Sequence, residues 1–391
     1  MLSWRGEACW YGGSRRSLAS DVANEDKATL YHRLQRRAAL AATLLGVSFL
    51  VVISVTGTAA LLGASLEAAL GSRALAAASF AAVLLLAHEL LALPLTYYRG
   101  VTLERRYGLS AETAAHWWLT HAKTLVVGGV LTIAAAVVLS ALIAWSPGRW
   151  WLLASALFGL LIVVLAWAAP VWLFPIFYEF RPLNRPALAS RLVELARRAG
   201  TPVSGVFEWR LGDRTRKANA ALVGLGDTRR ILLSDTLLET HSDDEVEVIL
   251  AHELAHQVYG DLWMGLGVQM VIVTAGLYAA HRALAVLHGS FGIAEMPTAV
   301  EQLPALALVS GAVALVLSPV AHALSRAHER RADRFAIERT GNAAAFMSAI
   351  RRLSSQNLAE ETPPAWVERL LHSHPSTARR LEAAQRFLKQ V

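Results

Sequence analysis

The chain has 391 residues, of which 55% are hydrophobic and only 17% are charged, and its mean hydropathy is +0.41. Soluble domains usually carry about 25% charged residues, so the long apolar runs that lower this share indicate an integral membrane protein. The single cysteine, Cys9, excludes an intramolecular disulfide framework and a cysteine-rich zinc site. Any bound metal must therefore be held by histidine and carboxylate side chains.

Six apolar runs are long enough to cross about 30 Å of hydrocarbon as helices. They cover residues 38–62, 74–98, 124–145, 150–178, 262–280 and 303–324. The first four form a predicted transmembrane unit, 38–178, with a cytoplasmic loop at 99–123, and Pro319 is expected to kink the sixth run. Residues 1–37 are polar and have no apolar core near the start, so we predict a polar cytoplasmic segment and no cleavable signal peptide.

Basic residues divide the segments outside these runs into two groups. Lysine and arginine number 7, 4, 11 and 12 in residues 1–37, 99–123, 179–261 and 325–391, but 1, 1 and 0 in residues 63–73, 146–149 and 288–301. With six spans, the four basic segments fall on one side, and the positive-inside rule makes that side the cytoplasm, with both termini inside. The net charge of +7 then follows from orientation, and no nucleic-acid partner is needed to explain it.

Segment 179–261 is the long polar stretch that precedes the fifth run. It predicts an amphipathic helix from Arg185 to Ala199, a strand from Val203 to Trp209 and a β-hairpin made by residues 217–223 and 229–233. We therefore predict a mainly α fold. A polytopic transmembrane helical bundle carries a cytoplasm-facing α+β domain at 179–391, into which the spans at about 262–280 and 303–324 are inserted.

The sequence His252-Glu253-Leu254-Ala255-His256 is an H-E-x-x-H motif. Ser242 and Glu245 form a predicted capping box that starts its helix. Residues four apart share one face of a helix, so His252 and His256 can direct two imidazoles at one metal ion. Glu253 lies at the edge of that face, where it can hold a water molecule. This arrangement is typical of zinc hydrolases, in which two nitrogen ligands, an open position and a carboxylate base act together.

A hydrolytic zinc site needs a third protein ligand. Glu329 follows the sixth run on the same predicted side of the membrane and is the candidate. Asp333, one turn on, shares its face and could accept the free N–H of a ligating histidine. His328 is a rival ligand, but it lies about 100° from Glu329 around the helix, so only one of the two faces the metal. On spacing alone, an ordinary basic helix next to the membrane explains Glu329 equally well.

A series of residues, matching in the same order along the chain, makes this sequence resemble the type I CAAX prenyl endoproteases. These are multi-span membrane zinc metallopeptidases with a gluzincin site. The resemblance runs from about residue 90 to 385. It rests on Pro94 to Tyr98, Glu104 to Ser110, Trp117, Lys123, Pro175 to Pro182, Asn219-Ala220, Gly224, Arg230 to Leu238, the H-E-x-x-H motif, Ser325-Arg326, Glu329, Ala332-Asp333, Ser373 to Ser376 and Arg380. Gln257 departs from the family, which often has tryptophan there, and residues 1–37 have no match.

The resemblance implies that His252, His256 and Glu329 bind one zinc ion and that Glu253 is the catalytic base. It places Asp333 at the family's carboxylate that orients a ligating histidine.

Four further residues take their expected roles from the same resemblance. His374 and Arg380 correspond to residues of the site wall. His374 could hydrogen-bond the developing oxyanion, and Arg380 could pair with a substrate carboxylate or with Asp333. Asn219 and Ala220 correspond to a strand that pairs with an extended substrate.

We therefore expect an integral-membrane zinc-dependent endopeptidase that cuts extended proteins at the cytoplasmic membrane face. The high alanine, leucine and arginine content indicates a GC-rich bacterial genome, so we expect a bacterial inner or plasma membrane. Prenylated C-a-a-X substrates are not expected there, which favours general proteolysis over their processing. A membrane scaffold or transporter with structural zinc is the non-enzymatic alternative. Eukaryotic family members are described with seven spans, so a count of six leaves open whether the spans enclose the family's chamber. The oligomeric state stays open.

Overall fold

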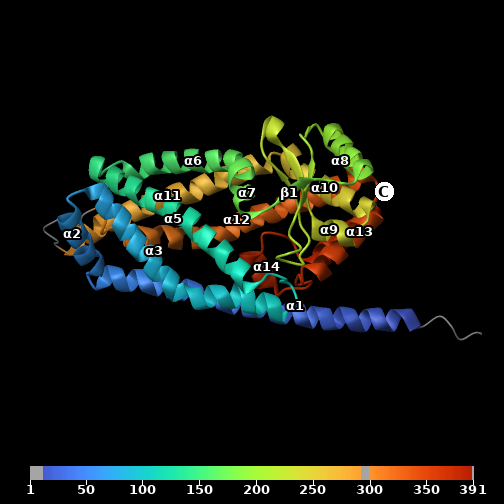
Figure 1. Ribbon diagram of the computed structural model, residues 1–391, viewed down its shortest axis with the longest axis horizontal. Coiled ribbons are helices and arrows are strands. Elements are labelled where there is room, and N and C mark those ends of the chain that lie inside the picture. The colour runs from blue at the N-terminus through green and yellow to red at the C-terminus, as the bar shows by residue number, and fades with distance from the viewer. Residues whose placement is uncertain (1–11, 292–298, 390–391) are drawn as a thin grey trace, which may run out of the picture.

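The computed structural model describes residues 12–291 and 299–389. The molecule is elongated, with long helices side by side over most of its length and a mixed α and β region at one end (Figure 1). Six of the described helices are long and apolar enough to cross a membrane, which confirms the predicted number and the fold class. They are α1 (Gly12–Val55), α3 (Arg73–Tyr97), α5 (Ala114–Trp145), α6 (Trp150–Ala168), α11 (Asp261–Phe291) and α12 (Leu303–Thr340).

The first span ends earlier than the predicted run, 38–62. Helix α1 stops at Val55, and Gly57, with φ 74°, turns the chain into a separate helix, α2 (Thr58–Leu70). Glycine reaches this left-handed conformation without the steric cost that a side chain adds. The 13 residues of α2 extend about 20 Å, too short to cross the hydrocarbon layer. Helix α1 also shows that residues 12–37 continue into the first span as one helix.

Two spans pass into π-helical turns at the end far from α2. Helix α3 continues as η1 (Tyr98–Leu103) and α4 (Glu104–Arg106), while α6 continues as η2 (Ala169–Leu173) and α7 (Phe174–Phe177). In contrast, α12 remains one helix of 38 residues through Pro319. A single helix therefore carries both the sixth span and Glu329.

A four-stranded sheet lies at the α and β end, in the order β1-β2-β4-β3. Its strands are β1 (Phe180–Pro182), β2 (Val206–Trp209), β3 (Ala220–Val223) and β4 (Arg230–Ser234). β3 and β4 form the predicted antiparallel hairpin, with a short 3-10 turn, η3 (Gly226–Thr228), in its loop. Gly224 is required in that loop, because its φ is 90° and a Cβ would lie 2.5 Å from the Thr228 carbonyl oxygen. β2 pairs parallel to β4, and β3 is an edge strand.

Six further helices of the described chain complete this end of the molecule. They are α8 (Pro186–Arg198), α9 (Asp235–Thr240), α10 (Asp243–Val258), α13 (Ala343–Gln356), α14 (Ala365–Leu371) and α15 (Thr377–Leu388). Of these, α8, α9 and α10 contact the sheet, α13 contacts α10, α14 contacts α12 and α15 contacts α13. One core joins the sheet to all of these helices except α14: Leu192 of α8, Leu233 of β4, Leu254 of α10 and Phe346 of α13 are each at most 1% exposed. Ala336 of α12 is buried in the same core, so the sixth span is fixed to the helix that carries the metal motif.

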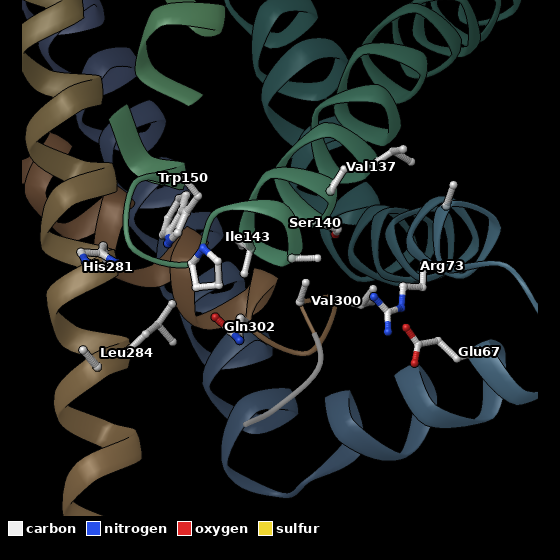
Figure 2. A pocket seen from close by; sticks show the side chains of 16 residues that line it. Glu67, Arg73, Val137, Ser140, Ile143, Trp150, His281, Leu284, Val300 and Gln302 are labelled. Carbon is white, nitrogen blue, oxygen red and sulfur yellow. The ribbon is translucent and has the colours of Figure 1, made fainter. Parts of the chain in front are cut away.

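A separate cavity of about 810 Å³ lies at the other end of the bundle, near α2. Figure 2 shows Glu67 of α2 and Arg73 of α3 close together on one side of this cavity, with Trp150 and His281 on the other side. None of the residues of the H-E-x-x-H motif lines it. This cavity therefore does not form part of the candidate site.

Candidate metal centre

Helix α10 starts at the predicted capping box. The Glu245 N–H donates to Ser242 Oγ at 3.3 Å, and the Ser242 N–H donates to Glu245 Oε2 at 2.8 Å. These bonds satisfy two backbone donors that a helix start would otherwise leave free. Ser348 of α13 donates to the other carboxylate oxygen at 2.6 Å, so the start of α10 is also tied to its neighbour. The helix thus enters the core in one fixed orientation.

Packing of α10 against α12 brings the three predicted ligands together. Nε2 of His252 lies 3.3 Å from Glu329 Oε2, and Nε2 of His256 lies 3.4 Å from Glu329 Oε1. One ligand atom from each residue lies within 4.8 Å of the others, and this is the one such group among the described residues. His252 is 9% exposed and Glu329 is 4% exposed.

The donor atoms of this group suit a zinc ion. Glu329 Oε2 is buried and accepts no hydrogen bond of good geometry from any described residue. A buried carboxylate oxygen without such a donor is costly unless a cation neutralises it. Two imidazole nitrogens and one carboxylate match the donor set of hydrolytic zinc sites. The residues therefore fit the metal, and their role as its ligands stays a prediction.

Each histidine is oriented through its second ring nitrogen. Nδ1 of His252 lies 2.9 Å from Asp333 Oδ1, and Nδ1 of His256 lies 2.9 Å from Asp261 Oδ2. Burial alone would lower the pKa of His252, but its contacts with Asp333 and Glu329 raise that pKa to about 9. The pKa of His256 is also raised, because contacts with Glu329 and Asp261 outweigh its burial. The contact of His256 with Asp261 is a hydrogen bond, whereas Nδ1 of His252 approaches Asp333 without a hydrogen bond of good geometry; in both residues Nε2 is the nitrogen that faces Glu329.

Asp261 is a residue that the sequence analysis missed. It is the first residue of α11, and its carboxylate also accepts a hydrogen bond from Arg331 and lies 3.5 Å from Nδ1 of His328. This contact turns His328 toward Asp261, whereas Glu329 lies between the two motif histidines. The only signal in the sequence was an acidic residue five positions after His256, at a helix start.

Replacing Asp261 by alanine is expected to weaken zinc binding roughly 10- to 100-fold, the usual cost of removing a partner that orients a ligand. The cause is loss of the 2.9 Å contact that fixes the ring of His256. Competition with a chelator measures the affinity. Asp243→Asn, at the start of α10 and paired with Arg185, is the control, and an affinity unchanged in Asp261→Ala would rule out the orienting role.

The predicted base and wall residues line a cavity of about 210 Å³ together with the three ligands. Burial raises the pKa of the Glu253 carboxyl, which suits a base that must give its proton back. Nδ1 of His374 lies 2.9 Å from Glu329 Oε2, and 62% of its side chain is exposed. Arg380 donates to both oxygens of Asp333, at 2.9 and 2.5 Å. Asp333, one of the two partners expected for Arg380, is therefore its partner in the structure.

Asn219 and Ala220 do not line this cavity. Asn219 lies immediately before β3, where its N–H donates to Ser234 Oγ and its C=O accepts from the Ser234 N–H, both at 2.9 Å. Ala220 is the first residue of β3. They belong to the sheet edge, and a substrate role for them stays a prediction.

Two family models match the chain. Residues 182–387 match the model of peptidase family M48, and residues 17–179 match the CAAX prenyl protease N-terminal family, described as five membrane helices. The second range contains the spans α1, α3, α5 and α6 and the short apolar α2.

Individual relatives extend the same comparison. An uncharacterized metalloprotease, YhfN, of Bacillus subtilis is 29% identical over 86% of this chain and 79% of its own length. A probable CAAX prenyl protease 1 of Schizosaccharomyces pombe is 27% identical over 75% of this chain and 62% of its own. The crystal structure of S. mikatae Ste24p shares the fold, with a TM-score of 0.79, 21% identity and coverage of 93% of this chain and 88% of that one. The chain thus belongs to peptidase family M48, as a membrane-embedded metalloprotease related to the CAAX prenyl proteases.

Proposed function

We propose that the protein is a zinc-dependent endopeptidase that cuts extended polypeptides at the cytoplasmic face of a bacterial plasma membrane. The observation that carries this proposal is the grouping of His252, His256 and Glu329 at one place, in a cavity that the carboxyl of Glu253 also lines. The basic segments support the cytoplasmic side. A reporter fused to the C-terminus tests the predicted cytoplasmic side, because we expect labelling from the inner side of the membrane only.

The chain's own residues then divide the reaction among them. His252, His256 and Glu329 would hold a zinc ion, which would supply Lewis-acid chemistry toward a peptide carbonyl and a water molecule. Glu253 takes the proton of the attacking water and returns it to the leaving amine. His374, exposed on the wall, donates a hydrogen bond to the developing oxyanion.

Arg380 acts at one remove from the reaction. Its paired bonds hold Asp333, which in turn holds the ring of His252.

Zinc binding is expected to strengthen as pH rises toward 9. The pKa of His252 in the metal-free site is about 9, so at neutral pH its imidazole carries a proton that the metal must displace. Below that pKa, affinity should fall by about tenfold per pH unit for each proton released. Isothermal titration calorimetry in buffers of different ionisation enthalpy counts the released protons, and a zinc affinity independent of pH between 6 and 9 would contradict this coupling.

An extended substrate would join the sheet as an added strand at β3, around Asn219 and Ala220. The position of β3 at the sheet edge supports this, because an edge strand offers unpaired N–H and C=O groups to another chain.

Relatives named CAAX prenyl proteases favour a second candidate substrate, a prenylated C-a-a-X protein. The test offers one peptide in farnesylated and unmodified form. Equal cleavage supports general proteolysis, and cleavage of the farnesylated form alone supports prenyl-protein processing. A scaffold with structural zinc would need a fourth protein ligand, and the described residues group only three.

A further inference from the structure

The open edge of β3 presents alternate residues to an incoming chain. In an antiparallel ladder, hydrogen-bonded pairs alternate with pairs whose N–H and C=O groups point outward. The Ser234 N–H donates to the Asn219 carbonyl, so Asn219 faces β4. Its alternate neighbours Ala218, Ala220 and Leu222 therefore direct their backbone groups away from β4, toward the open edge.

The side chain of Asn357 already occupies this edge at Ala218. The Ala218 N–H donates to Asn357 Oδ1 at 2.8 Å, and Asn357 Nδ2 donates to the Ala218 carbonyl at 3.1 Å. A carboxamide carries the same donor and acceptor as a peptide group, so Asn357 pairs with Ala218 as a strand residue would. Ala218 is consequently 4% exposed, while β3 beyond it is only partly buried.

The backbone next to Asn357 is held in a strained conformation. Leu358 has φ 52° and is the one residue other than glycine with a positive φ in the described chain. Its carbonyl accepts a hydrogen bond from Nε2 of His32 on α1 at 2.9 Å. Such conformations persist only where the surroundings enforce them, and they concentrate at functional sites. The backbone next to it therefore holds Asn357 in a fixed position at the edge of β3.

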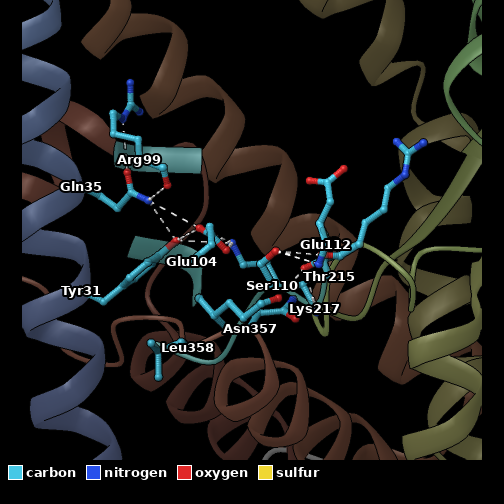
Figure 3. A network of polar contacts seen from close by, with 12 residues as sticks. Tyr31, Gln35, Arg99, Glu104, Ser110, Glu112, Thr215, Lys217, Asn357 and Leu358 are labelled. Carbon is cyan, nitrogen blue, oxygen red and sulfur yellow. Dashed lines mark hydrogen bonds and ion pairs between the residues drawn. The ribbon is translucent and has the colours of Figure 1, made fainter. Parts of the chain in front are cut away.

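The segment that precedes Ala218 is fixed as well (Figure 3). Nζ of Lys217 lies 3.0 Å from Glu104 Oε2, and the hydroxyl of Tyr31 donates to the same carboxylate. Ser110 and Thr215 form a β-bridge just upstream. Ala218 therefore cannot withdraw from Asn357 without breaking contacts to α1 and α4.

We propose that Asn357 is a specificity-determining residue that terminates the substrate-binding edge. An extended peptide pairs with Ala220 and Leu222, and Asn357 prevents its backbone from pairing with Ala218. This inference rests on the proposed addition of the substrate to β3. The neighbouring Gln356 is the matched control. Its side-chain nitrogen, Nε2, donates to the carbonyls of Arg216 and Thr236 and not to the outward-facing groups of β3.

The test is a scan of backbone N-methylation along a fluorescein-labelled peptide, with binding measured by anisotropy in the Glu253→Gln background in nanodiscs. Each methyl group removes one backbone donor. At a position that pairs with β3, it should weaken binding roughly two- to tenfold. We expect sensitive positions two residues apart, facing Ala220 and Leu222. Adding Asn357→Ala should create one further sensitive position two residues beyond, whereas adding Gln356→Ala should create none.

An identical pattern with and without folded Asn357→Ala overturns the proposal, and so does a peptide that binds without any sensitive position or fails to bind. Thermal unfolding shows whether the variant folds. If it does not, Asn357→Ser, whose side chain is too short to pair with Ala218, carries the same expectation. Cleavage by the protein with Glu253 intact is measured in parallel. Absent cleavage with the expected binding pattern would contradict the proposed function and leave this inference standing.

Discussion

Replacing Glu253 by glutamine is expected to abolish peptide hydrolysis while zinc stays bound at one ion per chain. The glutamine side chain has nearly the same shape but cannot accept a proton, so attack by water loses its base. General-base catalysis contributes roughly 10²- to 10⁴-fold, and the rate should fall by that factor. Because Glu253 is not one of the three grouped ligand residues, metal analysis should give the wild-type zinc content.

The matched control is Glu247→Gln, on the same helix. Glu247 pairs with Arg191 and does not line the cavity of the site, so its variant should hydrolyse peptide at the wild-type rate. Hydrolysis at the wild-type rate by purified Glu253→Gln would contradict the assigned role.

Replacing Glu329 by alanine is expected to remove both zinc and activity. The carboxylate lies within 3.4 Å of the ring nitrogens of both histidines, so its loss leaves two ligands where a hydrolytic zinc site has three. The fall in zinc affinity should exceed the roughly 100-fold that loss of an orienting partner causes. Affinity is measured by chelator competition and activity by peptide cleavage, with thermal unfolding followed alongside.

Glu338→Gln is the control for this change, because Glu338 lies on the same helix, pairs with Arg334 and is 45% exposed at its side chain. It should keep both zinc and activity. Zinc retained at full affinity by folded Glu329→Ala would instead show that another residue, such as His328, completes the site.

Local patterns in the sequence predicted much of the fold. The long apolar runs predicted six spans, and six are present among the described residues. Ser242 and Glu245 predicted the start of α10, and the capping box is formed there. The spacing of His252 and His256 needs only the helical repeat, so their common face could be predicted before any tertiary contact was known.

Features that depend on contacts between distant segments could not be predicted in this way. Hydropathy cannot detect the break at Gly57, because apolar residues lie on both sides of it. Strand β1 is only three residues long, ends in Pro182 and exists through its pairing with β2. Asp261 and Asn357 act through contacts that only the folded chain creates, and neither belongs to a local pattern.

X-ray absorption at the zinc edge tests most directly whether His252, His256 and Glu329 bind a catalytic zinc ion. Wild-type protein reconstituted in nanodiscs should bind one zinc ion per chain, with only nitrogen and oxygen donors at about 2.0–2.2 Å, two of them imidazoles. The His256→Ala variant should lose one imidazole from that spectrum, and its peptide cleavage should disappear with it. A spectrum unchanged by His256→Ala, or protein that cleaves peptide at full rate after zinc is stripped, would contradict the account.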